Sequence, residues 1–346
     1  MAGNTPRLGE FKSMEPIFSD IHQIGLVVKN VKETIKNYTE NYGIGPWNVW
    51  EFNADMVKDM EVRGKRLDYS MMVATCKSCN VDWEIVQPLD DKSIYSEFYS
   101  MYGEGLQHIN YIVKDYSRAK EHLIDRGVEV IQYGNLVGKH IFIYFGTEHD
   151  AKHIMETSTN LPGFKRREPH FVYHAEDEKN KVPKPIFNRI EQVGIVVKDI
   201  KKTAATLQDK YILGPWEFFK FNPSTVKDMH VSGKNQNHSF DTAICKIGGI
   251  QLELVKPNDD KSIFSKHLSR FGEGLHHVCF SVNDLDMVSE KIKSQGKKTM
   301  QSGNWHGQKY AYFSTENDLK FTACFYEEKE SFKRPDPYYT YLFDKS

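Results

Sequence analysis

Short apolar runs alternate with helical patterns along the chain. Ile24 to Val28 is a mostly apolar run that predicts a buried strand, and Val31 to Tyr42 carries apolar side chains at helical spacing. The same order returns after His108, with a strand predicted to Val113 and a helix from Tyr116 to Arg126. Each helix is followed by β-rich runs separated by turn residues, so the pattern predicts units of the form βαβββ. In the first unit these runs are Trp47 to Phe52, Tyr69 to Thr75 and Val81 to Val86.

The same pattern occurs twice in the chain. Gly45-Pro46-Trp47 recurs as Gly214-Pro215-Trp216, and Gly103-Glu104-Gly105-Leu106 recurs as Gly272-Glu273-Gly274-Leu275. Both pairs lie 169 residues apart, as in 214 − 45. A repeat of this length indicates a duplicated domain, because the units of a solenoid are only about 20–50 residues long. Each half holds two βαβββ units, so we expect an α+β protein with four of them.

The repeat also sets the expected domain boundaries. The residues between the halves are rich in proline and charge, which is typical of a linker. Near the C-terminus, Tyr338 to Phe343 is apolar enough that we expect it to dock on the protein. The predicted segments are an N-terminal tail over 1–18, a first domain over 19–160, a linker over 161–187, a second domain over 188–328 and a C-terminal tail over 329–346.

Composition and charge argue against several kinds of partner. The 346 residues carry a formal net charge of −1, which offers no basic field for nucleic acid or for an anionic membrane. The first residues lack an apolar signal sequence, and no stretch is long enough to span a bilayer. We therefore expect a cytoplasmic monomer or homodimer without nucleic-acid or membrane partners.

One Cys-x-x-Cys sequence invites a redox or zinc interpretation. It consists of Cys76 and Cys79, and the copy retains the first as Cys245 but replaces the second by Gly248. Two cysteines supply only half of the ligands of a structural zinc site. We therefore expect reduced thiols beside a β-turn, without a disulfide framework.

Four βαβββ units in tandem resemble the vicinal oxygen chelate superfamily, which includes glyoxalases, bleomycin resistance proteins and extradiol dioxygenases. The most specific part is Pro88-Leu89-Asp90-Asp91-Lys92-Ser93 followed by Gly103 to Ile109, which is similar to the junction between the units of methylmalonyl-CoA epimerases. The resemblance implies two tandem half-open-barrel, glyoxalase-like domains that curl around a metal. Units pair within a half or across halves in such an arrangement, and the short junction favours pairing within a half.

The resemblance further implies that the metal ligands lie on the first and last strands of each unit. His108 lies five residues before the valine that ends its strand, and the same count in the first unit reaches Gln23 rather than His22. The copy retains the glutamine as Gln192 and replaces His22 by Glu191. A glutamine oxygen is an acceptable ligand for a divalent cation, although it is weaker than imidazole. We therefore prefer Gln23 to His22.

Two carboxylates complete the predicted set. Glu84 stands between apolar residues in the last strand of the first unit, where a carboxylate is costly to bury unless it is paired or bound to a metal. Glu156 stands in the last strand of the second unit. The alternative is a group of half-buried polar residues without a metal. The four predicted ligands, which match the ligand types of glutamine-containing glyoxalase I and differ from the usual epimerase set at Glu84, are Gln23, Glu84, His108 and Glu156.

The second half departs from this set at one position. It keeps Gln192, Glu253 and His277 but has Cys324 in place of Glu156, allowing for one residue deleted upstream. A thiolate can bind a soft metal but is a poor substitute for a carboxylate base. We therefore expect the second site to be altered or silent. From the sequence alone, an equally complete set across the halves would be Gln192, Glu253, His108 and Glu156.

Four weaker candidates concern the substrate. Glu61 lies near the point where epimerases carry a second acid or base, and its copy is His230; the alternative is a solvated turn carboxylate. Trp47, Trp216 and His22 are candidates for the substrate pocket. For the two tryptophans, packing in the core is the more common alternative.

These residues predict a metal-dependent isomerase or epimerase that abstracts a proton next to a carbonyl, with Glu156 as ligand and base and Glu61 as second acid or base. The expected substrate is a small carbonyl compound such as an acyl-CoA or a keto acid. The expected cofactor is a divalent ion: zinc, nickel, cobalt, manganese or iron. The alternatives are a glyoxalase-type lyase acting on a thiol adduct and a metal-free protein that binds and sequesters a small molecule.

Overall fold

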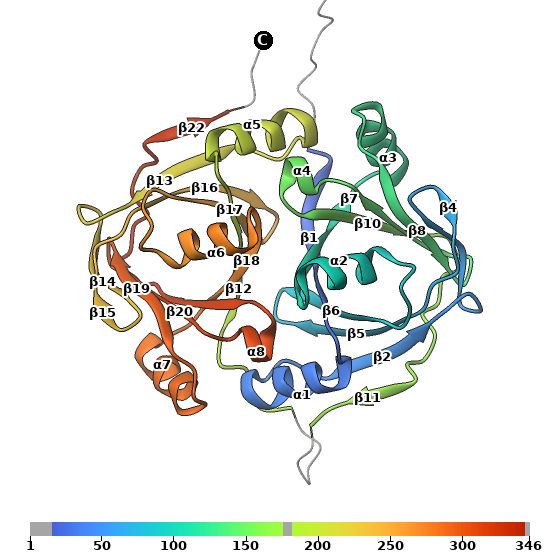
Figure 1. The fold of residues 1–346 in the computed structure, drawn as a ribbon, viewed down its shortest axis with the longest axis horizontal. Coiled ribbons are helices and arrows are strands. Elements are labelled where there is room, and N and C mark those ends of the chain that lie inside the picture. Colours follow the sequence, from blue (N-terminus) through green and yellow to red (C-terminus); the bar gives the residue numbers. More distant parts are fainter. Residues whose placement is uncertain (1–15, 176–181, 343–346) are drawn as a thin grey trace, which may run out of the picture.

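The chain folds into two curled sheets of eleven strands, one from each half of the sequence (Figure 1). The computed structural model describes residues 16–175 and 182–342, and no helix in these ranges has the length and apolar character needed to cross a bilayer. The elements of the first half are β1 (Phe18–Val27), α1 (Val31–Tyr42), β2 (Trp47–Phe52), β3 (Val57–Val62), β4 (Lys65–Arg66), β5 (Met71–Ser78), β6 (Val81–Pro88), α2 (Ile94–Tyr102), β7 (Gly105–Val113), α3 (Tyr116–Asp125), β8 (Val130–Leu136), β9 (His140–Phe145), α4 (Glu148–Ala151), β10 (Ile154–Asn160) and β11 (Phe171–Tyr173). Those of the second half are β12 (Arg189–Val196), α5 (Ile200–Tyr211), β13 (Trp216–Phe221), β14 (Val226–Val231), β15 (Lys234–Asn235), β16 (Phe240–Ile247), β17 (Ile250–Pro257), α6 (Ile263–Phe271), β18 (Gly274–Ser281), α7 (Leu285–Ser294), β19 (Thr299–Trp305), β20 (Gln308–Phe313), α8 (Glu316–Leu319), β21 (Thr322–Glu327) and β22 (Tyr339–Tyr341).

The units pair within each half. The first sheet has the order β11-β2-β5-β6-β1-β7-β10-β9-β8-β3-β4, and the second has the corresponding order from β22 to β15. Strands β1 and β7, which begin the two units of the first half, pair antiparallel at the centre of the sheet. The predicted α+β fold of four βαβββ units in two tandem half-open barrels is therefore confirmed.

The helix and strand patterns account for most elements. Helix α1 has the predicted bounds, because Asn30 caps its first turn and Gly43 ends it in the left-handed conformation at φ 71°. The hairpin of β3 and β4 was not predicted. In β3 the buried residues are Val57, Met60 and Val62, and Asp59 between them has φ 55°, which breaks the period-two pattern of a strand.

The expected linker and C-terminal tail each contribute a strand to a sheet. Strand β11 pairs antiparallel with β2, and β22 pairs in the same way with β13. Both segments were expected to lie outside the repeat, but Phe164-Lys165-Arg166 recurs as Phe332-Lys333-Arg334, and Pro169 as Pro337. The offset here is 168 (334 − 166) instead of 169, because one residue is deleted within the second half. The repeated unit therefore extends into both segments, and the C-terminal run docks as expected.

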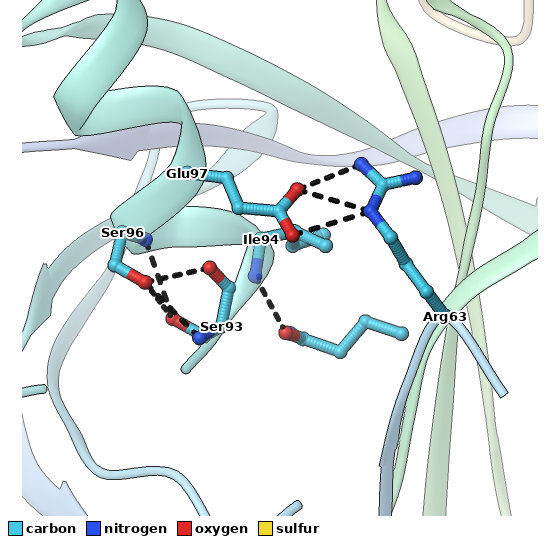
Figure 2. Close-up of polar contacts among 6 residues, drawn as sticks. Arg63, Ser93, Ile94, Ser96 and Glu97 are labelled. Atoms are coloured by element: carbon cyan, nitrogen blue, oxygen red, sulfur yellow. Dashed lines mark hydrogen bonds and ion pairs between the residues drawn. The ribbon is translucent and has the colours of Figure 1, made fainter. Parts of the chain in front are cut away.

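Helix α2 connects the two units of the first half and is fixed at its start. The Ser96 N–H donates to Ser93 Oγ at 3.3 Å and the Ser93 N–H donates to Ser96 Oγ at 3.0 Å, which forms a capping box (Figure 2). Arg63, in the turn between β3 and β4, pairs with Glu97 of the helix at 2.7 Å. These contacts hold the junction that leads into β7.

The halves pack with matching contacts on both sides of their interface. Lys152 pairs with Glu273 at 3.0 Å, and the repeated pair Lys320 and Glu104 also lies at 3.0 Å. The indole of Trp83 in the first half also stacks on the ring of Phe321 in the second, with centroids 5.7 Å apart. The hydrophobic core therefore runs across both halves.

Candidate metal centre

Three side chains from three strands meet at the bottom of the first barrel. His108 of β7 has its Nε2 3.1 Å from Glu84 Oε2 of β6 and 3.4 Å from Glu156 Oε2 of β10. One ligand atom of each residue lies within 4.8 Å of the others. In residues 16–175 and 182–342 this is the one such group of histidine, cysteine or acidic side chains.

Strand register explains why these residues meet. Gly25 of β1 lies opposite His108 in β7 and beside Glu84 in β6, while Asn110, two residues after His108, lies beside Glu156. Residues two apart in a strand share a face, so the three side chains point into the same barrel. A Cβ at Gly25 would collide with the ring of His108, so glycine is required there.

A hydrogen bond to Gln107 orients the imidazole of His108 so that its Nε2 can bind a metal. His108 Nδ1 lies 2.6 Å from Gln107 Oε1, and this contact favours the tautomer with the ring proton on Nδ1, because a carboxamide oxygen can only accept. The Nε2 lone pair then faces two carboxylate oxygens. Three acceptors at this distance require a proton or a cation between them. Ligands about 2.0–2.2 Å from one ion lie about 3.0–3.5 Å apart, so the observed separations fit a shared metal.

Glu156 is the most deeply placed carboxylate of this group. It is buried, and its Oε2 has no hydrogen-bond partner in the described structure. Burial first, and then the charge of Glu84, raise the pKa of the Glu156 carboxyl well above its usual range. A bound cation would compensate both effects, so the donor set fits a divalent metal.

Gln23 occupies the position in the first unit that His108 occupies in the second. In the antiparallel pairing of β1 with β7, Gln23 lies opposite Asn110 and His108 lies opposite Gly25. The symmetry that relates the two units therefore exchanges Gln23 with His108. Gln23 is largely buried and lines the same cavity as the two carboxylates. It therefore remains the predicted fourth ligand.

His22 also lines the cavity but lies nearer to solvent. A register shift in β1 occurs at this residue, and its side chain is 44% exposed, 4.0 Å from Asp82. This position suits a contact at the mouth better than a ligand at the bottom.

The other sequence candidates lie away from the cavity. Trp47 and Trp216 are completely buried in the core, where the indole N–H of each donates to a backbone carbonyl of the preceding turn. Glu61 lies opposite Tyr133 in the pairing of β3 with β8 and does not line the cavity. The structure therefore does not bring Glu61 to the candidate centre.

Several cavity residues were missed from the sequence. The space above the centre has a volume of about 80 Å³, which is enough to hold several water molecules. Tyr95 donates to Tyr144 at 2.8 Å beside the carboxylates. In a strand or helix pattern these tyrosines cannot be distinguished from core residues. Arg166 and Arg167, which also line the cavity, come from the segment that the sequence predicts as a linker. The residues that the sequence analysis did not select include Trp50, Tyr95, Asn110, His140, Tyr144, Arg166 and Arg167.

The second half keeps part of the arrangement. His277 Nε2 lies 3.1 Å from Glu253 Oε2, as in the first half. Cys324 lies beside Cys279 in parallel strands, where the first half has Glu156 beside Asn110, so the alignment with one deleted residue holds. Within the described ranges no third acidic, histidine or cysteine ligand joins Glu253 and His277.

The five cysteines are free thiols in the structure. Cys76 is buried in β5, and Cys79 is exposed in the turn before β6. Burial raises the pKa of the Cys76 thiol to about 12. This agrees with thiols beside a β-turn.

The chain belongs to the glyoxalase/bleomycin resistance protein/dioxygenase superfamily. The model of this family matches residues 22–145 and 191–313, one match in each half. The vicinal oxygen chelate fold and its duplication are therefore shown by sequence and structure together.

Individual relatives are distant. The uncharacterized protein YqjC of Bacillus subtilis (strain 168) is 27% identical over 108 residues, which cover 31% of this chain and 67% of that protein. A mutant of 4-hydroxymandelate synthase from Streptomyces coelicolor has a similar fold, with a TM-score of 0.56, 11% identity and coverage of 92% of this chain and 94% of that chain. Methylmalonyl-CoA epimerase from Mycobacterium tuberculosis matches with a TM-score of 0.32 and 17% identity, over 44% of this chain and 96% of that chain. At 11% identity the synthase structure shows the fold alone.

Proposed function

We propose that this chain is a metal-dependent isomerase or epimerase that removes a proton from a carbon next to a carbonyl. The observation that carries this proposal is the convergence of Glu84, His108 and Glu156 at a cavity in the first barrel. One imidazole and two carboxylates form a donor set for a divalent cation. Glu156 lines this cavity, and its Oε2, 3.4 Å from His108 Nε2, has no hydrogen-bond partner among the described residues.

Each residue has a distinct role in this proposal. Gln23, Glu84, His108 and Glu156 would hold the ion, Glu156 would also act as the base, and Gln107 accepts a hydrogen bond from His108 Nδ1–H. When bound, a divalent ion acts as a Lewis acid that makes the C–H next to a carbonyl more acidic. Glu156 accepts the proton, and the electron pair of the broken C–H bond stays on the substrate as an enolate.

The cavity favours proton transfer by a single base. Glu84 and Glu156 are the two carboxylates among the described residues that line it. Because Glu84 would be held as a ligand and Glu61 lies elsewhere, Glu156 both removes the proton and returns it. One base of this kind suits an isomerase that moves a proton between neighbouring carbons.

Deuterium wash-in tests the reaction without a known product. The protein is incubated in D₂O with acyl-CoA thioesters, 2-oxo acids and the adduct of methylglyoxal with glutathione, and exchange at the α-carbon is followed by mass spectrometry. We expect exchange in at least one substrate, a loss of about 100-fold or more in Glu156→Gln, and no loss in Cys324→Ser, the matched position of the second half. Unimpaired exchange in Glu156→Gln would contradict the proposal. Net conversion of the glutathione adduct would assign the reaction to the lyase alternative.

A further inference from the structure

A segment after the first barrel carries two arginines to the mouth of the cavity. Residues 161–170, which we name the strap, lead from β10 to β11. The Trp50 indole N–H donates to the Arg167 carbonyl at 3.1 Å, and the Glu51 N–H donates to His170 Nδ1 at 2.9 Å. Pairing of β11 with β2 fixes the far end. The backbone of the strap is therefore held against β2, and Arg166 and Arg167 line the cavity.

Arg166 presents a cation without a protein counter-ion. Its guanidinium lies over the ring of Trp50, 5.4 Å from the centroid. Among the described residues no carboxylate forms an ion pair with it. The positive charge of Arg166 also contributes to lowering the pKa of nearby His140, after the larger effect of burial. The stacked ring thus orients a guanidinium whose hydrogen-bond donors remain available.

The negative side chains that line the cavity lie at the candidate metal centre, and the positive ones lie near its mouth. Its two carboxylates, Glu84 and Glu156, lie at the candidate metal centre, and its arginines come from the strap. Once a divalent cation compensates the carboxylates, the arginines leave an excess of positive charge at the mouth. An arginine fork binds carboxylate and phosphate oxygens in a bidentate manner.

The corresponding arginine of the second half has a hydrogen-bond partner within the protein. Arg334, the copy of Arg166, lies over Phe219, the copy of Trp50, at 5.8 Å. Its Nη2 donates to Gln251 Oε1 at 3.1 Å. Gln251 stands at the position of Asp82 in the first half, and its hydrogen bond occupies the guanidinium of Arg334. This gives Arg166 a matched control within the same chain.

We propose that Arg166 binds an anionic group, a carboxylate or a phosphate, at the end of the substrate distant from the reacting carbonyl. This inference rests on the proposed function for the position of the reacting end. It restricts the substrates of the first half to carbonyl compounds with a second anionic group, such as 2-oxo diacids or phosphate-bearing thioesters. Arg334 has no such role.

Calorimetric titration of the Mn²⁺-loaded full chain tests this inference. The probes are 2-oxoglutarate, which has a distal carboxylate, acetyl-CoA, which has distal phosphates, and 2-oxobutyrate, which lacks a second anionic group. We expect one of the two anionic probes to bind wild type more tightly than 2-oxobutyrate does. Arg166→Gln should weaken that binding by about 10-fold or more. Arg334→Gln should leave it unchanged, and the metal content and 2-oxobutyrate affinity of both variants should match wild type.

The outcomes separate the two proposals and the two sources of the anion. A loss confined to 2-oxoglutarate assigns a carboxylate, and a loss confined to acetyl-CoA assigns a phosphate. Equal affinity for anionic and neutral-ended probes, including no binding of any, overturns the inference, as does equal weakening by Arg166→Gln and Arg334→Gln. Because binding is measured without turnover, an absence of proton exchange would remove the proposed function and leave a positive binding result intact.

Discussion

At the scale of single residues, His108 is the point on which the candidate centre depends. Its Nε2 lies within 3.4 Å of both carboxylates, and its Nδ1 is held by Gln107. Ligand orientation by such an outer partner commonly contributes about 10- to 100-fold to metal affinity. Gln107 is therefore expected to contribute to metal affinity through its contact with His108.

Gln107→Leu tests this dependence. Leucine removes the acceptor for Nδ1–H without adding charge, so the imidazole is free to place its proton on Nε2. We expect metal affinity to fall by about 10- to 100-fold, measured by competition with a chelating dye. An affinity equal to that of wild type would show that the ring is oriented by packing alone.

Gly25→Ala gives a second test with a built-in control. The new methyl group collides with the ring of His108, and Gly194→Ala creates the same collision with His277 in the second half. We expect each variant to lose about 1–3 kcal/mol of unfolding free energy in urea denaturation. Only Gly25→Ala should also lose bound metal, and retention of metal in that variant would contradict the proposed geometry.

At single residues the sequence could predict strand register. The count that selects Gln23 over His22 agrees with the observed register, in which Gln23 and His108 hold equivalent positions, and the role of Gln23 as a ligand stays a prediction. The structure does not place Trp47 or Glu61 on the cavity, since a strand pattern does not show whether a side chain faces the cavity or the core. Tyr144 was missed for the same reason.

At the scale of elements, α2 and its copy α6 set the junctions between units. Ser93 and Ser262 are both fully buried N-cap residues whose hydroxyls accept from the N–H three residues later. Buried caps stabilise a helix by about 1 kcal/mol. Ser93 and Ser262 therefore have the same role as N-caps of α2 and α6.

Ser93→Ala and Ser262→Ala should therefore behave alike. We expect each to lower the unfolding free energy by about 1 kcal/mol, measured by urea denaturation, because each leaves an N–H of the first helical turn without its acceptor. A loss of less than about 0.3 kcal/mol in both would show that neighbouring groups replace the cap.

Long, regular elements were predictable and short ones were not. Helix α1 and strand β2 match the expected bounds because each has a clear period and a turn residue at its end. Strands β11 and β22 have three residues each and follow charged and proline-containing segments. Three residues are too few to show a period, and the change of offset from 169 to 168 concealed their repetition.

At the scale of the whole molecule, an ion pair between the two halves depends on their assembly. Lys210 of the second half lies 2.6 Å from Asp150 of the first. Burial of the Asp150 carboxyl raises its pKa, but hydrogen bonds from Lys210 and His149 outweigh this effect and lower the pKa to about 2. The ionised carboxylate is therefore favoured by the assembled halves.

This shift fixes the pH dependence of the Asp150 contribution. A carboxyl whose pKa is lower in the folded protein stabilises it above the unfolded pKa of about 4, and this stabilisation is lost as the pH falls towards 2. Asp150→Asn should thus cost about 0.5–1 kcal/mol at pH 7, the size expected for a partly exposed pair, and nearly nothing at pH 2. Urea denaturation at both pH values checks this, and an equal cost at both would contradict it.

The division of labour between the halves is the central claim of this account. The first half has Glu84, His108 and Glu156 within reach of one ion, whereas the second has Cys324 at the position of Glu156. The duplicated fold supplies a matched pair of histidines with the same carboxylate contact at 3.1 Å. Their comparison separates metal binding from folding.

Metal analysis of the purified full chain by mass spectrometry, for wild type, His108→Ala and His277→Ala, is the most direct measurement. We expect about one divalent ion per chain in wild type and in His277→Ala, and about none in His108→Ala. Retention of the ion in His108→Ala, or a wild-type protein that holds no ion after exposure to Zn²⁺, Mn²⁺, Ni²⁺, Co²⁺ and Fe²⁺, would contradict it.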